Sequence, residues 1–369
     1  MTYKGKVISG DSHIDHIWLP SDLFVSNAPN HLKDRMPHVE DRPDGAQWFV
    51  ENTQLGWVAG GGGLDASWEH YVPGQSSRCD RMEEVGHFFS DGQKGLFHPS
   101  TPELRIKDQD LDGISGEVIY GILAMAGGLT GFTEKEKTPE SGITDPDVVA
   151  YVYEIYNEWV SDFCKANPDR LVALGCISAH DPKLAAKQLR RAAEIGLRGV
   201  EMNVGVAREP IYHKDWDVLW AASHDTGLPI SFHTTGLRTR QPKQTDHKDY
   251  MWVNIGVTMC AFQLAGNEFM SSIILSGACD RFPNFKFVLG ECGVGWIPYM
   301  LHRMDEEYDR QLFHLNLSLK PSEFWHRQGY STFQHEYLTN EIIDTVGEDN
   351  IMWGSDYPHP DGVWPDSRQ

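Results

Sequence analysis

An alternation of short apolar runs with helix-like segments, which begins near Ile106, constrains the fold of this chain most strongly. The apolar runs end in polar residues, and the segments between them repeat apolar residues at helical spacing. With one earlier run near the N-terminus, eight strands are expected, at residues 7–10, 116–120, 170–177, 199–203, 228–233, 285–291, 330–333 and 351–356. Helices are expected at 147–167, 182–195, 216–226, 257–272 and 296–308. Apolar strands separated by helices pair in parallel, and eight of them favour a closed (β/α)8 TIM barrel over an open sheet.

The length of 369 residues fits one barrel domain over residues 1–369, although two ordinary domains also fit it. Prolines, tryptophans and four glycines at 60–63 interrupt residues 20–105, so we predict a long irregular insert after the first strand. The sequence ends soon after Asp356, so a closing helix is expected to be absent or short. This favours either a truncated chain or cover by a second subunit, in a homo-oligomer or with a related barrel.

The charge balance excludes several classes of partner. Fifty-three acidic and 32 basic residues give a formal net charge of −21, which repels nucleic acid and anionic membranes and leaves a small molecule as the expected substrate. No apolar stretch approaches the roughly 18 residues of a membrane span. The six cysteines show no close pairing and the N-terminus has no signal-like pattern, so we expect a reduced, cytoplasmic protein.

Polar residues recur where the expected strands end, which is where a barrel of this kind carries its active site. These residues are Asp11 and His13, His233, Glu291, His335 and Asp356. Any one of them alone is more often a helix cap or a hydrogen-bonded histidine. Their recurrence at one pole of successive strands favours a metal site. Mixed oxygen and nitrogen ligands suit zinc, manganese or iron, and the lack of cysteines among them argues against a structural zinc or iron–sulfur site.

Motifs along most of the chain carry a family resemblance. They are Asp11-Ser-His13, Asp110-Leu-Asp112-Gly-Ile, Asn167-Pro-Asp-Arg170, Gly196-Leu-Arg-Gly199, Phe232-His233, Asp280-Arg-Phe-Pro, Gly290-Glu-Cys-Gly-Val-Gly-Trp296 and Gly354-Ser-Asp356-Tyr-Pro-His359. The chain resembles the amidohydrolase-related family of the amidohydrolase superfamily, which includes aminocarboxymuconate-semialdehyde and resorcylate-type decarboxylases. The resemblance implies metal ligands at Asp11, His13 and His233, and a ligand or base at Asp356.

Two positions depart from that family. Glu291 stands where the decarboxylases carry a catalytic histidine, and His16 stands where related sequences often have a glutamate. A carboxylate there is compatible with a proton acceptor or with a ligand, and Glu291 and His16 together would complete six candidate ligands for one or two ions. The favoured function is therefore hydrolysis or non-oxidative decarboxylation of a small carboxylate-bearing substrate. The alternatives are a dinuclear iron/manganese monooxygenase and a non-catalytic barrel paired with a catalytic subunit.

Further residues are candidates for substrate binding. His359 follows the last strand and could bind substrate or a second metal, or make a helix-terminal hydrogen bond. His247 lies in the loop after the fifth strand, near Arg238 and Arg240, which could hold a carboxylate in a bidentate manner or remain solvated. Trp68 belongs to an aromatic stretch that could either line a lid over the pocket or pack in the core.

Overall fold

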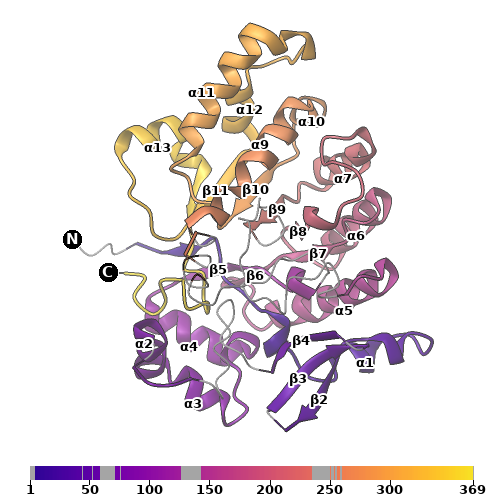
Figure 1. Cartoon of the computed structure of the whole chain (residues 1–369), viewed down its shortest axis with the longest axis vertical. Coiled ribbons are helices and arrows are strands. Elements are labelled where there is room, and N and C mark those ends of the chain that lie inside the picture. The colour runs from indigo at the N-terminus through magenta and orange to yellow at the C-terminus, as the bar shows by residue number, and fades with distance from the viewer. Residues whose placement is uncertain are drawn as a thin grey trace. The chain divides into compact units, whose positions relative to one another are not determined.

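The computed structural model (Figure 1) describes residues 5–43, 45–51, 53–58, 71–74, 76–125, 143–234, 250, 253, 256–257 and 260–368. The chain divides into two compact units. Unit 1 comprises Met1–Ile177, Glu194–Arg198 and Trp353–Gln369, and unit 2 comprises Ser178–Ala193 and Gly199–Met352. None of the described helices is long and apolar enough to cross a membrane.

Unit 1 contains a parallel sheet in the order β1 (Ile8–Ser9), β5 (Gly116–Ile119) and β6 (Leu171–Ala173). Helix α5 (Pro146–Cys164) connects the last two strands and begins as its sequence predicts. The Asp145 side chain accepts hydrogen bonds from two backbone N–H groups of the first turn, and Pro146 occupies a position that needs no donor. Buried residues recur along one face of α5 at helical spacing, so the helix is held by packing as well as by its cap.

The third expected strand is divided at Leu174 into β6 and β7 (Gly175–Ile177). The side chain of Asn157, on α5, explains the break. Its Oδ1 accepts a hydrogen bond from the backbone N–H of Cys176 at 2.7 Å, and its Nδ2 donates to the Cys176 carbonyl at 2.9 Å. A side chain therefore hydrogen-bonds to both backbone groups of Cys176.

The prediction of an irregular segment at 20–105 is wrong for its described residues. They form α1 (Leu23–Asn27), α2 (Ser77–Gly86), α3 (Phe88–Gly92), the start of α4 (Pro102–Asp112) and an antiparallel sheet of β2 (His38–Arg42), β3 (Gly45–Val50) and β4 (Thr53–Trp57). The three strands are only partly buried, so they lack the apolar runs by which the parallel strands were recognised. The glycines at 60–63 lie outside the described residues.

The segment after Asp356 is anchored to α2 and α4 within unit 1. The indole of Trp364 lies so close to Gly86 that a Cβ there would fall 2.4 Å from the ring. The backbone N–H of Ser367 donates to Asp112 at 2.8 Å, and Arg81 pairs with Asp366 at 3.1 Å. This tail therefore covers part of unit 1 without forming a helix.

Unit 2 contains parallel strands in the order β12-β11-β10-β9-β8. Their bounds are β8 (Val200–Met202), β9 (Ile230–His233), β10 (Phe287–Gly290), β11 (Gly329–Phe333) and β12 (Ile351–Trp353). The unit's helices are α6 (Pro182–Glu194), α7 (Asp217–Thr226), α9 (Gly266–Leu275), α10 (Ala278–Arg281), α11 (Ile297–Glu307), α12 (Pro321–Gln328) and α13 (Asn340–Val346). Helices α6, α7 and α11 match the expected ones closely, whereas α12 and α13 were not predicted.

The α/β class is confirmed, and each expected strand segment contains at least one short strand. Closure of the eight strands into a barrel is not shown. The pairings within unit 1 make one open parallel sheet, and those within unit 2 make another, among the residues that the structure describes.

Candidate metal site

Two segments far apart in the sequence are joined by backbone hydrogen bonds in unit 1, and they bring Asp11, His13 and Asp356 together. Asp356 N donates to the Asp11 carbonyl at 3.0 Å, and His13 N donates to the Tyr357 carbonyl at 2.7 Å. Gly354 permits the close approach, because a Cβ there would lie 2.4 Å from the Asp11 Cβ. The side chains that follow β1 and β12 are thus held side by side by the main chain.

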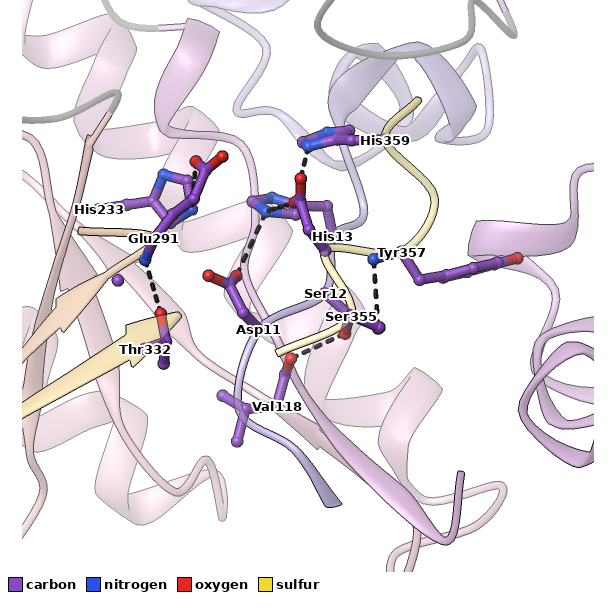
Figure 2. A network of polar contacts seen from close by, with 12 residues as sticks. Asp11, Ser12, His13, Val118, His233, Glu291, Thr332, Ser355, Tyr357 and His359 are labelled. Carbon is purple, nitrogen blue, oxygen red and sulfur yellow. Dashed lines mark hydrogen bonds and ion pairs between the residues drawn. The ribbon is translucent and has the colours of Figure 1, made fainter. Parts of the chain in front are cut away.

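The imidazole of His13 lies between two buried carboxylates. Its Nε2 is 3.4 Å from Asp11 Oδ1 and 3.0 Å from Asp356 Oδ1 (Figure 2). Asp11 and Asp356 are fully buried, and His13 is 4% exposed. Both oxygens of Asp356 are buried and accept no hydrogen bond from the described part of the chain. A buried charged group without hydrogen bonds is costly unless a cation compensates it.

These spacings match those between neighbouring ligands of one metal ion. With metal–ligand bonds of about 2.1 Å, adjacent ligand atoms are about 3.0 Å apart in octahedral and about 3.4 Å apart in tetrahedral geometry. The donor set of carboxylate oxygen and imidazole nitrogen suits zinc, manganese or iron. The residues present in unit 1 therefore fit a divalent metal.

His359 and Asp15 extend this cluster. His359 Nδ1 lies 3.0 Å from Asp356 Oδ1, and its Nε2 forms a hydrogen bond of 3.0 Å with Asp15 Oδ2. The ring of His359 stacks on that of His13 with centroids 4.1 Å apart (Figure 2). His359 belongs to two groups of side chains whose ligand atoms lie close enough together to bind one metal ion. One group is His13, Asp15 and His359, and the other is Asp356, His359 and Asp361.

The electrostatics show how strongly this cluster attracts positive charge. Burial alone would lower the pKa of His13, as would the neighbouring His359, but the Asp11 and Asp356 carboxylates outweigh both and raise it to about 10. Burial would raise the pKa of Asp15, but His359 lowers it to about 2. The pKa of Asp356 is likewise lowered despite burial, chiefly by His359. Without a metal, protonated imidazoles supply the charge that a bound cation would otherwise supply.

A second acid–imidazole pair lies in unit 2, where β9 and β10 end. Gly290 pairs with His233 in the sheet, so His233 and Glu291 leave neighbouring strands at the same edge. Glu291 Oε2 is 3.4 Å from His233 Nε2 and accepts a 2.8 Å hydrogen bond from Thr234 Oγ1. The backbone at Glu291 is left-handed, with φ of 54°, and its N–H donates to Thr332 Oγ1 at 2.6 Å (Figure 2). The threonine bond holds this uncommon conformation.

The remaining predicted site residues have other surroundings. His16 Nε2 lies 3.0 Å from the Leu55 carbonyl. Among the described residues, His16 is not part of any group of side chains close enough together to bind one metal ion. His335 is exposed beyond β11. The substrate candidates His247, Arg238, Arg240 and Trp68 lie outside the described residues.

Sequence reasoning missed Asp15 and Arg105. Asp15 follows His13 by two positions, and that spacing was the only available signal. Arg105 is fully buried on α4, where its Nη1 donates at 2.8 Å to the carbonyls of His13 and Pro99. Its Nη2 donates to Ser12 Oγ at 3.0 Å. An arginine in a helical sequence carries no sign that it supports the backbone of a strand end.

Comparisons with known proteins show the family of this chain. An amidohydrolase family model matches residues 129–369. Gamma-resorcylate decarboxylase from Rhizobium sp. (strain MTP-10005) is 24% identical in an alignment of 225 positions that covers 55% of this chain and 64% of that protein. The chain thus spans just under two thirds of that relative's length.

Two solved structures have similar folds. An amidohydrolase from Mycobacterium avium subsp. paratuberculosis has a TM-score of 0.70 at 17% identity, covering 98% of this chain and 90% of its own. A 5-carboxyvanillate decarboxylase from Novosphingobium aromaticivorans, complexed with manganese and 4-hydroxy-3-methoxy-5-nitrobenzoic acid, has a TM-score of 0.60 at 17% identity, covering 96% and 87%. The family model covers well over half of the chain, and the resemblance noted from the motifs is confirmed: this chain belongs to the amidohydrolase family.

Proposed function

We propose that this chain is a metal-dependent enzyme that removes a carboxylate from a small substrate without oxidation. The observation that carries the proposal is the buried cluster of Asp11, His13 and Asp356, whose spacing and charge suit a divalent ion. Similarity to gamma-resorcylate decarboxylase favours decarboxylation over hydrolysis. The manganese in the similar 5-carboxyvanillate decarboxylase supports a divalent metal.

We also propose that the strands of both units belong to one (β/α)8 barrel. In such a barrel the carboxyl ends of all strands face one pole, so His233 would join Asp11, His13 and Asp356 as a ligand. The support is the family membership together with the parallel strands of each unit. Bound there, a divalent ion would act as a Lewis acid toward the substrate's oxygen atoms.

The reaction requires a proton at a defined place. The bond between the substrate carbon and its carboxylate breaks, carbon dioxide leaves, and the electron pair that stays on the carbon takes up a proton. Glu291 occupies the position of the histidine that serves the related decarboxylases. Its carboxyl group accepts a hydrogen bond from Thr234, and Thr332 accepts one from the Glu291 backbone N–H; this carboxyl group is the one we assign to hold and deliver the proton.

The test combines metal analysis with turnover. Protein dialysed against Mn²⁺ is incubated under strict anaerobiosis with γ-resorcylate and with 5-carboxyvanillate, the compounds after which the two relatives are named, and carbon dioxide and product are quantified. We expect bound metal and oxygen-independent carbon dioxide release from a compound of this class. The variant Asp356→Asn should lose both.

Three results would contradict the proposal. Protein without bound metal after dialysis would remove its basis, and carbon dioxide release unchanged in Asp356→Asn would show that the cluster is not involved. Turnover that requires both iron and oxygen would instead favour the monooxygenase alternative, since iron can change oxidation state where zinc cannot.

A further inference from the structure

A buried amide group lies at the carboxyl end of β8 in unit 2. Asn203 directly follows this strand and is 2% exposed. Its Oδ1 accepts a hydrogen bond from the backbone N–H of Gly205 at 2.9 Å. That bond identifies the other side-chain atom as the nitrogen, which can only donate. Within the part of the chain that the structure describes, Nδ2 has no hydrogen-bond partner.

A capping role alone does not explain why this residue is an asparagine. Asn203 caps the short 3-10 turn Val204–Val206 through the bond from Gly205. Aspartate caps such turns about as well, and it brings no N–H donors. A buried donor without an acceptor costs more than a typical hydrogen bond contributes. The amide nitrogen therefore indicates an acceptor that a bound molecule supplies.

The strand register places Asn203 in a row with His233 and Glu291. Glu201 on β8 pairs with Ser231 on β9, and Asn203 and His233 stand two positions further along. The backbone at Asn203 is still extended, with φ of −86° and ψ of 96°, so Asn203 and His233 lie on the same face of the sheet. Glu291 follows the next strand, so its position is about 10 Å from that of Asn203, or two strand spacings. A small molecule beside Glu291 is thus within reach of the amide.

We propose that Asn203 is a specificity-determining residue, whose Nδ2 donates a hydrogen bond to an oxygen atom that the substrate carries apart from its departing carboxylate. The inference rests on the proposed function in that Glu291 marks the carbon that loses the carboxylate. Because Asn203 is two strands away from Glu291, it contacts a more distant part of the substrate. An amide N–H selects a hydroxyl, phenolate or carbonyl oxygen there, since a bound molecule without that oxygen leaves the buried donor unpaired.

The test compares the binding of two probes to Mn²⁺-loaded protein by calorimetry. γ-Resorcylate carries two hydroxyl groups beside its carboxylate, and benzoate carries none. The native chain should bind γ-resorcylate more tightly than benzoate. Asn203→Ser and Asn203→Asp keep an oxygen for the Gly205 N–H, so the melting temperature should stay near native. Both variants should bind γ-resorcylate about 10–100-fold more weakly, the size expected for losing a hydrogen bond to a charged acceptor. Benzoate affinity should change little in Asn203→Ser.

The matched control is Asn284, which is exposed in the turn before β10. Asn284→Ser and Asn284→Asp should bind both probes as the native chain does. Native affinity for γ-resorcylate in a folded Asn203 variant would overturn the inference. So would an equal loss of both probes together with a lower melting temperature, which is the result expected of a cap alone, or a native chain without preference for γ-resorcylate. An Asn203-dependent preference without carbon dioxide release would support the inference and contradict the proposed function.

Discussion

Arg105 offers the sharpest test of how the metal-binding segments are supported. It is fully buried and forms an ion pair with Glu117 on β5, and it donates hydrogen bonds to Ser12, His13 and Pro99. Its guanidinium also lies 5.0 Å from the ring centroid of Tyr357. One side chain thus contacts both chain segments that carry Asp11, His13 and Asp356. The substitution Arg105→Met removes these donors while keeping most of the apolar stem.

The expected loss of folding stability follows from the burial of Arg105 and Glu117. Removing one partner of a buried ion pair leaves the other charge uncompensated and costs about 3–5 kcal/mol. Glu117 is 2% exposed and would retain the neutral donor of Gln109 in place of a charged one. Taking about 2.1 cal/mol/K of unfolding entropy per residue, a chain of 369 residues should lose about 4–6 °C in melting temperature. The carbonyl of His13 would also lose its donor, so Mn²⁺ affinity should fall 10–100-fold.

Calorimetry and Mn²⁺ titration measure the two effects. The matched control is Arg190→Met, which breaks an ion pair with Asp225 at 2.8 Å where both side chains are about half exposed, and it should cost at most about 1 kcal/mol. The double variant Arg105→Met with Glu117→Leu should recover part of the stability, because no charge is then left unpaired. A melting temperature and a Mn²⁺ affinity in Arg105→Met as close to native as in the control would refute the reasoning.

Three further predictions concern individual side chains. Glu291→Gln should keep all bound metal and lose turnover, because an amide cannot carry the proton; loss of one metal would identify Glu291 as a ligand instead. His16→Gln should leave Mn²⁺ stoichiometry unchanged, since His16 faces the Leu55 carbonyl, and a lost ion would contradict this. In metal-free protein the pKa of His13 lies near 10, above its ordinary 6.5, so its stabilising contribution is complete below pH 6.5 and lost as the pH rises through 10. Melting temperature should therefore fall over that interval, and less so in His13→Asn.

Much of the fold could be predicted because its signals are local. Most of the parallel strands are rich in buried apolar residues, so a short run such as 285–291 can be recognised as a strand without reference to its neighbours. The antiparallel strands β2, β3 and β4 were missed because they are stabilised by pairing with each other and expose many side chains. Pairing partners do not appear in the local pattern of any one strand.

Some features of the candidate site could likewise be predicted from the sequence, and others could not. The sequence by itself determined which residue types follow the strands, and hence that Asp11, His13 and Asp356 are ligand candidates, because strand ends and polar residues are both visible in one dimension. Only the tertiary structure decided that His359 and Asp15 join them, that His16 contacts the Leu55 carbonyl, and that Arg105 supports the His13 backbone. The reason is physical: hydrogen bonds and ion pairs act over about 3 Å in space, and the residues that come so close are separated by up to several hundred positions along the chain.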